Sequence, residues 1–564
     1  MSQASTPVGG EPRPGQDEPN EKPGLVQDKT KTPPDANGHR DSDGNGPGDG
    51  DIAEYQYPSS AKLTIITFAL CLSVFLMALD NSIIATAIPR ITDQFHSLED
   101  VGWYGSAYLL TTAALQLQFG NFYTILSIKW TFLSAIGFFE LGSLLCGAAQ
   151  SSTMLIVGRA VAGLGAAGIY SGAVLILANS VPLARRPAYI GLIGGMYGVS
   201  SVAGPLLGGA FTDKVSWRWC FYINLPIGGV TAVLIAFFFP ETRQRRLPAE
   251  PWRRRAARFD PLGTLFLMPG VVCLLLALQW GGTDYTWASG RIVALLVLGG
   301  VLLLGFAAVQ AWQQENATVP PRILRSRTVW ASVLYAFGLG ASFFVAVYFI
   351  PIWFQGVKGD SAVGSGIRNL PMMLSAVMLS IVAGIAVTAQ GQYAPFLILG
   401  TVLMSVGAGL LSTWMPDTSQ ASWIGYQVVF GVGVGMCLQQ PVVAVQTVLG
   451  IDDVAVGASL IVFTQSMGGA MFVSVGQTVF TNHLVQALAQ YVPAIDPTRV
   501  LNAGATGLES SFSADELPGI ILSYNEALTK VFLVSTAMAA FTIFGCVFVE
   551  WRSVKGKQVE VPMA

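Results

Sequence analysis

Apolar stretches of roughly twenty residues recur along the chain from Leu63 onward, separated by shorter polar connections. A helix that crosses a bilayer needs about twenty residues at about 1.5 Å of rise each. The pattern predicts membrane spans over residues 63–86, 102–122, 129–149, 154–178, 188–211, 219–239, 262–281, 291–312, 329–352, 367–388, 394–414, 422–446, 456–481 and 529–549. We therefore expect an all-α polytopic membrane protein with about fourteen transmembrane helices.

The segments outside these spans differ in composition. Residues 1–61 are rich in Gly, Pro, Asp and Glu, with scarcely an aliphatic residue. Such a segment cannot offset its ordering entropy by burial, so we expect a disordered tail. Residues 483–528 form one long connection between the last two spans, and residues 553–564 form a second short tail.

The positions of Lys and Arg predict the orientation, because basic residues close to a span are retained on the cytoplasmic side. The largest basic cluster, from Arg243 to Arg258, follows the sixth span. If the N-terminal tail is inside, the inner connections also hold Lys129, Arg185, Arg186, Arg322, Arg325, Arg327, Arg552, Lys555 and Lys557. Both termini should then be cytoplasmic, and residues 483–528 external.

Composition agrees with a membrane protein and excludes other classes. Hydrophobic residues make up 52% of the chain and charged residues 11%, which is more apolar surface than a soluble protein can hide. The net charge of -2 gives no reason to expect nucleic acid as a partner. The six cysteines lie in apolar runs without the close spacing of zinc or redox pairs, so we expect no metal site. They are Cys71, Cys146, Cys220, Cys273, Cys437 and Cys546.

Ionisable groups at bilayer depth each cost about 3 kcal/mol, and three such residues stand out. They are Asp80 in the first span, Glu140 in the third and Arg159 in the fourth. Counting residues back to the external ends places all three roughly 8 to 14 Å below the outer surface, so they can be neighbours. Two interpretations stay open: a proton relay, or an ion pair that only locks helices together. For Glu140 a third interpretation is that it faces the protein interior and only bonds a neighbouring residue.

The fifth span combines glycines with a proline that removes one backbone hydrogen bond, so this helix can bend and pack tightly. The residues concerned are Gly194, Gly198, Gly204, Pro205, Gly208 and Gly209. Pro371 and Pro441 mark similar interruptions later in the chain. Irregular backbone at membrane depth favours a moving transporter over an inert anchor, although proline kinks also occur in static bundles.

Residues 163–168 match the G-x-G-x-x-G pattern of dinucleotide-binding proteins, but they lie inside an apolar run with no strand before it. Small residues at helical spacing, such as Gly168 with Gly172 and Gly204 with Gly208, instead let two helix backbones approach closely. The pattern therefore predicts helix packing and no cofactor.

Uncharged polar residues in several spans suit a cavity for a mostly apolar molecule that makes a few hydrogen bonds. The candidates are Asn81, Gln116, Asn224, Gln439, Gln440 and Gln465. The alternative for each is a hydrogen bond between helices.

Four segments carry a further combination of motifs. They read LDNSII at 79–84 with Ile88-Pro89, LIVGR at 155–159, GGMYGVSSVAGPLLGG at 194–209 and WRWCFYINLPIG at 217–228. Together they resemble the major facilitator superfamily, and within it the fourteen-spanner drug/proton antiporter family known from fungal toxin and drug exporters. The loop at 120–130 departs from the superfamily pattern, because it lacks an aspartate and an Arg-Lys pair. The gating salt bridge usual for that loop is therefore in question here.

The resemblance implies a major facilitator fold with alternating access to a central cavity. It implies two six-helix bundles at 62–240 and 329–552, joined by 241–328, which holds a basic inner loop and two extra helices. In the family, the arginine matching Arg159 is associated with proton transfer. The implied partners are a small-molecule substrate, protons and the bilayer, for a monomer without a cofactor.

The resulting hypothesis is an exporter in the plasma membrane that uses the inward proton gradient to expel an amphipathic drug, toxin or metabolite. One alternative is a vacuolar or plasma-membrane carrier for a basic amino acid, a siderophore or another metabolite. A second is a transporter-like sensor. The tail has no predicted folded module, which counts against a sensor. An enzyme is not expected, because His96 and His483 have no metal or nucleophile constellation near them.

Overall fold

The computed structural model describes residues 58–96, 100–240, 258–282, 285–505 and 507–555. Residues 1–57 of the predicted disordered tail lie outside the described residues. So do residues 241–257 of the basic inner loop and residues 556–564. The chain divides into two units, Met1–Tyr55 and Gln56–Ala564, and every helix described below belongs to the second unit.

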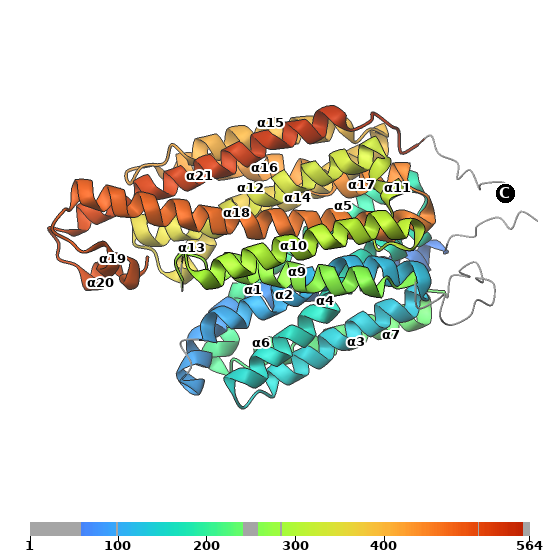
Figure 1. The fold of residues 1–564 in the computed structure, drawn as a ribbon, viewed down its shortest axis with the longest axis horizontal. Helices are drawn as coiled ribbons and strands as arrows, with labels where there is room; N and C mark the ends of the chain where they lie inside the picture. Colours follow the sequence, from blue (N-terminus) through green and yellow to red (C-terminus); the bar gives the residue numbers. More distant parts are fainter. Residues whose placement is uncertain (1–57, 97–99, 241–257, 283–284, 506, 556–564) are drawn as a thin grey trace, which may run out of the picture. The chain divides into compact units, whose positions relative to one another are not determined.

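The first half of this unit is a bundle of six spans (Figure 1). It consists of α1 (Ser60–Phe95), α2 (Val101–Ile125), α3 (Ile128–Gly147), α4 (Ser152–Ser180), α5 (Arg186–Lys214) and a sixth span divided into α6 (Trp219–Tyr222) and α7 (Asn224–Phe238). The main packed pairs are α3 with α4, α2 with α4, α1 with α5 and α1 with α7.

The second half is a similar bundle. Its spans are α12 (Arg327–Lys358), α14 (Leu370–Gln390), α15 (Ala394–Leu411), α16 (Gln420–Cys437) followed by α17 (Gln440–Val448), α18 (Val454–Tyr491) and α21 (Leu517–Phe548). Shorter helices α13 (Ala362–Arg368), α19 (Pro497–Ala503) and α20 (Leu508–Ser511) lie in connections. The largest contacts between the bundles are those of α5 with α14 and of α2 with α18, and α4 also contacts α18.

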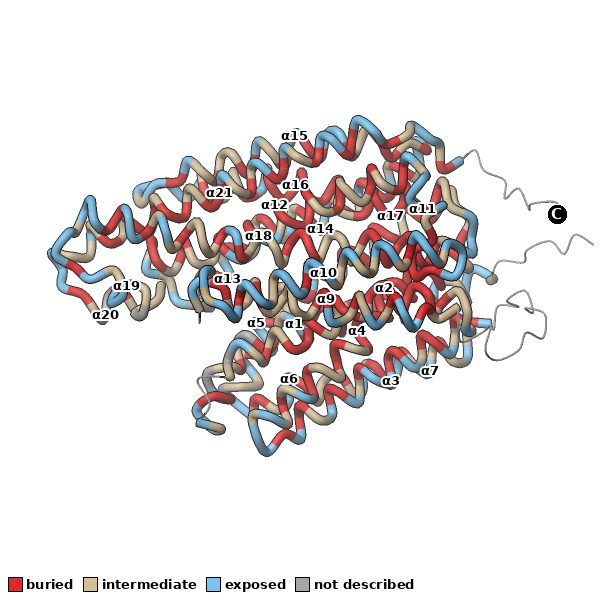
Figure 2. Tube along the Cα trace, in the orientation of Figure 1, coloured by how far each residue is buried: buried red, intermediate tan, exposed pale blue. Residues whose placement is uncertain are grey.

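Two further helices, α9 (Pro261–Trp280) and α10 (Gly290–Gln313), pack against each other outside the bundles (Figure 1). Helix α9 contacts both α2 and α18, so it covers one seam between the halves. Helix α10 is largely exposed (Figure 2), with Leu304 74% and Trp312 76% accessible. In a membrane this apolar surface faces lipid. The short helix α11 (Pro321–Arg325) then leads into α12.

Thirteen of the described helices are long and apolar enough to cross a membrane. Helix α2 is the remaining predicted span, with 25 residues, but polar side chains such as Thr111, Gln116 and Gln118 interrupt its apolar surface. It can carry them because α4, α9 and α18 pack around it and cover much of its length. The prediction of an all-α polytopic membrane protein with about fourteen spans is confirmed.

Helix α1 begins and helix α21 ends at the same end of the bundles (Figure 1), which we call the terminal end. The other end is called the opposite end below. Helices α18 and α21 have 38 and 32 residues, more than one crossing requires. The connection predicted at 483–528 therefore contains the last residues of α18, helices α19 and α20, and the start of α21.

Candidate functional site

Asp80 on α1 and Arg159 on α4 form a salt bridge, and both side chains are fully buried. Helix α2 completes the site. Arg159 Nε donates a hydrogen bond of 2.8 Å to the Tyr104 carbonyl, and its guanidinium lies 4.4 Å from the centroid of the Tyr108 ring. Charges taken out of water at this depth are tolerated only when they are paired and hydrogen-bonded, so each partner requires the other.

Asn224, at the start of α7, joins this ion pair to α3. Its Nδ2 atom donates to Asp80 Oδ1 at 3.1 Å and to Ser143 Oγ at 3.0 Å. The side chain is fully buried. The sequence suggested Asn224 as a residue of the substrate cavity, whereas the structure places it beside the ion pair.

Glu140 does not join the pair. It lies on α3 one turn before Ser143 and faces α7, where a Cβ added to Gly228 would lie only 1.6 Å from Glu140 Oε1. Neither oxygen of its carboxyl group has a hydrogen-bond partner among the described residues. Of the residues Asp80, Glu140 and Arg159, the structure therefore brings two together and leaves Glu140 at the neighbouring contact between α3 and α7.

The glycines of α5 face different partners along the helix. Towards the terminal end, a Cβ on Gly191 would lie 2.6 Å from the Ser380 carbonyl, and one on Gly198 would lie 1.7 Å from a Val377 methyl, both on α14. Further along, the glycines face α1. A Cβ on Gly204 would lie 2.2 Å from Ser82 Oγ, and one on Gly208 would lie 2.1 Å from Thr86 Oγ1.

The prediction of close helix packing is confirmed at these glycines, and also at Gly168 and Gly172 of α4, which lie against Phe119 and Tyr123. Two residues of the motif differ. Pro205 lies within α5, in the region that contacts α1, and a Cβ on Gly209 would meet no described atom within 4 Å.

A hydrogen bond joins the two bundles near the break between α16 and α17. Tyr170 Oη of α4 donates to Gln439 Oε1 at 2.6 Å, and the ring of Tyr197 on α5 packs edge-on against Tyr170 at 6.1 Å. Gly194 leaves room for Gln439, since a Cβ there would lie 2.0 Å from Gln439 Nε2. Towards the terminal end, the backbone N–H of Ala188 donates to Thr388 Oγ1 at 3.1 Å.

The loop that departs from the superfamily pattern also lies at the terminal end. Asn121 Nδ2 donates to the Arg258 carbonyl at 3.0 Å, and Tyr123 Oη donates to the Gly168 carbonyl at 2.9 Å. Gly120 lies against α18, because a Cβ added to it would lie 2.8 Å from Ser459 Oγ. Uncharged hydrogen bonds and close backbone packing hold the helices together here.

The remaining cavity candidates occupy separate places. Asn81 is exposed beside Asp80, Gln116 and Gln440 are buried on α2 and α17, and Gln465 is partly buried on α18. In the described part of the chain, Gln116 Nε2 and Gln440 Oε1 have no hydrogen-bond partner. The structure therefore identifies Gln439 as the candidate that contacts both bundles.

Several residues of the site were not found from the sequence. Tyr104, Tyr108, Ser143 and Tyr170 are ordinary residues of membrane helices, and only contacts with other helices give them a place in the site. One signal was available: Tyr104 and Tyr108 are four residues apart, so they lie on one face of a helix.

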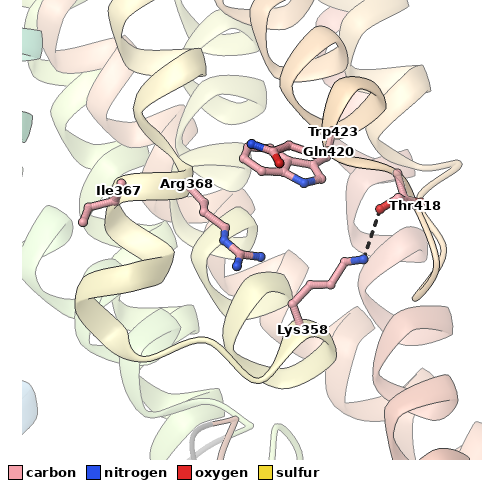
Figure 3. Close-up of a pocket in the computed structure, with 6 residues that line it drawn as sticks. All are labelled: Lys358, Ile367, Arg368, Thr418, Gln420 and Trp423. Carbon is pink, nitrogen blue, oxygen red and sulfur yellow. Dashed lines mark hydrogen bonds between the residues drawn. The ribbon is translucent and has the colours of Figure 1, made fainter.

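A hollow at the opposite end of the second bundle is lined by Lys358, Ile367, Arg368, Thr418, Gln420 and Trp423 (Figure 3). Lys358 Nζ donates to the Thr418 carbonyl at 3.1 Å, and Arg368 pairs with Asp360 at 2.9 Å. Both cations thus have partners in the protein. Elsewhere among the described residues, no group of His, Cys, Asp or Glu side chains could hold a metal ion.

Comparison with known proteins gives the family. The profile of the Major Facilitator Superfamily matches residues 70–473. The chain is 56% identical over 510 residues to the MFS-type efflux pump MFS1 of Trichophyton rubrum, covering 90% of this chain and 95% of the relative. It is 52% identical to the aspyridones efflux protein of Neocamarosporium betae, covering 90% of each chain.

A solved structure shares the fold. The proton:xylose symporter XylE superposes with a TM-score of 0.58 at 13% identity, covering 89% of this chain and 98% of the symporter. The relatives named above are efflux proteins, which agrees with the expectation of a transporter rather than an enzyme. On the extent of the profile match and the identity to these relatives, this multi-pass membrane protein belongs to the Major Facilitator Superfamily.

Proposed function

We propose that this protein is a proton-coupled antiporter that exports amphipathic small molecules from a fungal cell. The observation that carries the proposal is the fully buried salt bridge between Asp80 and Arg159. Protonation of Asp80 removes the negative charge that compensates Arg159, so the packing of α1 against α4 becomes unfavourable. Uptake of a proton thereby shifts the balance between two arrangements of the helices.

The cargo we propose is a mostly apolar molecule with a few hydrogen-bonding groups, such as a fungal secondary metabolite. Uncharged polar side chains, Tyr170, Tyr197 and Gln439, lie where the two bundles meet. Asp80 already pairs with Arg159, and Glu140 lies between α3 and α7, away from the contact between the two bundles. A cationic cargo such as a basic amino acid would require an acidic group there.

We further propose that the terminal end faces the cytoplasm, because Lys129, Arg185, Arg322 and Arg552 lie there. In this arrangement both tails, residues 1–61 and 553–564, are cytoplasmic, and residues 483–528 are external. The bond between Tyr170 and Gln439 then belongs to a state closed towards the cytoplasm. The bundles at 62–240 and 329–552 act as the two moving halves of a monomer in the plasma membrane, joined by residues 241–328.

Transport into sealed vesicles tests the proposal. The purified protein is reconstituted, a pH gradient is imposed, and uptake of a panel of amphipathic dyes and fungal metabolites, aspyridones included, is measured with and without a protonophore. We expect accumulation that collapses with the protonophore and falls by about tenfold or more in Asp80→Asn. Asp93→Asn is the matched control, because Asp93 lies on the same helix and is exposed. Proton-driven accumulation that persists in Asp80→Asn would mean that the ion pair only locks the helices together.

A further inference from the structure

We propose that Asn224 is a positioning residue that transmits the protonation of Asp80 to the contact between α3 and α7. The inference rests on the proposed function and adds a second step to it. The side chain of Asn224 lies between the ion pair and α3, and both N–H groups of its amide are used, one on Asp80 and one on Ser143. Its Oδ1 atom, although buried, has no partner among the described residues.

The hydrogen-bonding capacity of Asp80 changes when it takes up a proton. An ionised carboxylate only accepts hydrogen bonds, so it faces the amino group of Asn224. Asp80 Oδ2 is occupied by Arg159, and the incoming proton therefore binds Oδ1, the oxygen that faces Asn224. Protonated Oδ1 becomes a donor, and two donors then face each other.

Rotation of the Asn224 amide resolves this conflict. The unused Oδ1 atom of Asn224 turns towards Asp80 and accepts the new O–H, while the amino group turns away. The amino group can then no longer donate to Ser143 in its present place, so the bond that ties α7 to α3 is lost or rebuilt. Glu140 and Gly228 form the next contact between α3 and α7, one helical turn away.

A purely structural role would require only a donor to the buried Asp80 Oδ1. The amide oxygen of Asn224, buried and without a partner among the described residues, is an acceptor that such a role leaves unused. The charged and titratable side chains around Asp80 are Arg159 of α4, Tyr108 of α2, Glu140 and Cys146 of α3, and Cys220 of α6. Arg159 binds the other carboxylate oxygen, and Asn224 is the side chain that links Asp80 to α3 by hydrogen bonds.

The test compares two rates in the same vesicles. One rate is dye accumulation driven by a pH gradient, and the other is exchange of labelled for unlabelled dye at equal pH on both sides, with no gradient to drive protons across. Asn224→Leu should lose gradient-driven accumulation by about tenfold or more and keep exchange within about twofold. Ser143→Ala, which removes only the contact with α3, should lower accumulation in the same direction and to a smaller extent.

Thr231→Val is the matched control, because Thr231 is buried on the same helix and, among the described residues, its hydroxyl bonds only the Ile227 carbonyl of its own helix. Both of its rates should stay near those of the unmodified protein. Equal loss of both rates in Asn224→Leu and Ser143→Ala would overturn the inference in favour of a structural role, and so would unchanged accumulation in both. If the unmodified protein exchanges dye but does not respond to the gradient, the proposed function itself fails, and the inference with it.

Discussion

At the scale of single residues, Arg159 depends on contacts from several helices. It pairs with Asp80 of α1 and binds the Tyr104 carbonyl and the Tyr108 ring of α2. Its Nη2 atom has no partner among the described residues, so any loss of the Asp80 charge leaves a poorly compensated cation in the protein interior. The site therefore combines a strong interaction with a high sensitivity to one proton.

This dependence predicts an unequal effect of single and double substitutions. Arg159→Met leaves the Asp80 carboxylate buried without its counterion, which should lower the free energy of unfolding by about 3–5 kcal/mol. The double variant Asp80→Asn with Arg159→Met removes both charges and should regain much of that loss. Thermal unfolding of the purified variants in detergent measures both, and a double variant less stable than the single one would contradict the argument.

Glu140 is predicted to tolerate neutralisation. Its carboxyl group has no hydrogen-bond partner among the described residues and faces a glycine, so Glu140→Gln keeps the shape and removes only a charge that the surroundings disfavour. Gradient-driven transport should stay within about twofold of the unmodified protein. The vesicle assay described above checks this, and a loss as large as that of Asp80→Asn would instead place Glu140 on the proton path.

The sequence identified the ionisable residues of the spans but not their partners. Depth in the membrane can be counted from the residues of a helix, and this indicated that Asp80, Glu140 and Arg159 lie at similar levels. Which helices are adjacent, and how each is rotated, depends on contacts distant in sequence. For that reason the sequence could neither separate Glu140 from the pair nor predict the hydrogen bonds of Asn224 to Asp80 and Ser143.

At the scale of elements, α5 is built to pack closely on two partners. Its glycines near Gly191 and Gly198 face α14 of the other bundle, whereas Gly204 and Gly208 face α1 of its own. The motif was visible in the sequence, and close packing could be predicted from it. The change of partner along the helix could not, because it depends on how the two bundles cross.

A side chain on the inter-bundle face of α5 should disrupt transport. Gly198→Leu forces α5 and α14 apart, with a stability cost of about 1–3 kcal/mol and a loss of transport of about tenfold or more. Gly209→Leu is the control on the same helix, because no atom of the described residues lies within 4 Å of a Cβ there. Vesicle transport and thermal unfolding of both variants test this, and equal behaviour of the two would refute it.

At the scale of the whole described unit, α9, α10 and α11 fasten the two bundles together. Asp260, fully buried before α9, accepts hydrogen bonds from Gln310 at 2.6 Å, Gln313 at 2.8 Å and the Thr318 hydroxyl at 2.8 Å. The preceding Phe259 carbonyl accepts from Gln118 of α2 at 2.7 Å. These bonds hold the extra helices against the first bundle.

A more exposed contact joins α11 to the second bundle. Arg322 of α11 pairs with Asp453 at 2.6 Å, in the short helix η4 (Ile451–Asp453), and with Glu315 at 2.7 Å. Hydrogen bonds to these two carboxylates raise the pKa of Arg322 above its usual value, so it stays charged at any physiological pH. The Arg322 side chain is 48% exposed, however, and pairs of this kind contribute little to stability.

The two contacts should respond differently to substitution. Asp260→Ala leaves several buried donors unsatisfied, at about 1–3 kcal/mol for each, and should lower the thermal stability of the protein markedly. Arg322→Gln should change the free energy of unfolding by about 1 kcal/mol or less. Unfolding curves of both variants in the same detergent measure this difference, and a larger effect of Arg322→Gln would reverse the assignment.

The number of spans was predictable because apolar length is a direct requirement of the bilayer. The pairing of α2 with α18 and of α5 with α14 could not be predicted from the span pattern, since the helices concerned are far apart in the sequence. The seam covered by α9 also depends on side chains such as Gln118, which the span pattern treats simply as polar interruptions.

All six cysteines are free thiols, and five of them are buried, with Cys273 partly so. A membrane-impermeant maleimide should therefore leave the native chain almost unlabelled and react only with a cysteine introduced on the surface. Fluorophores attached to one such position on each bundle would report the distance between the halves in single molecules. The motion of the pump could thus be recorded without first replacing the thiols that pack its core.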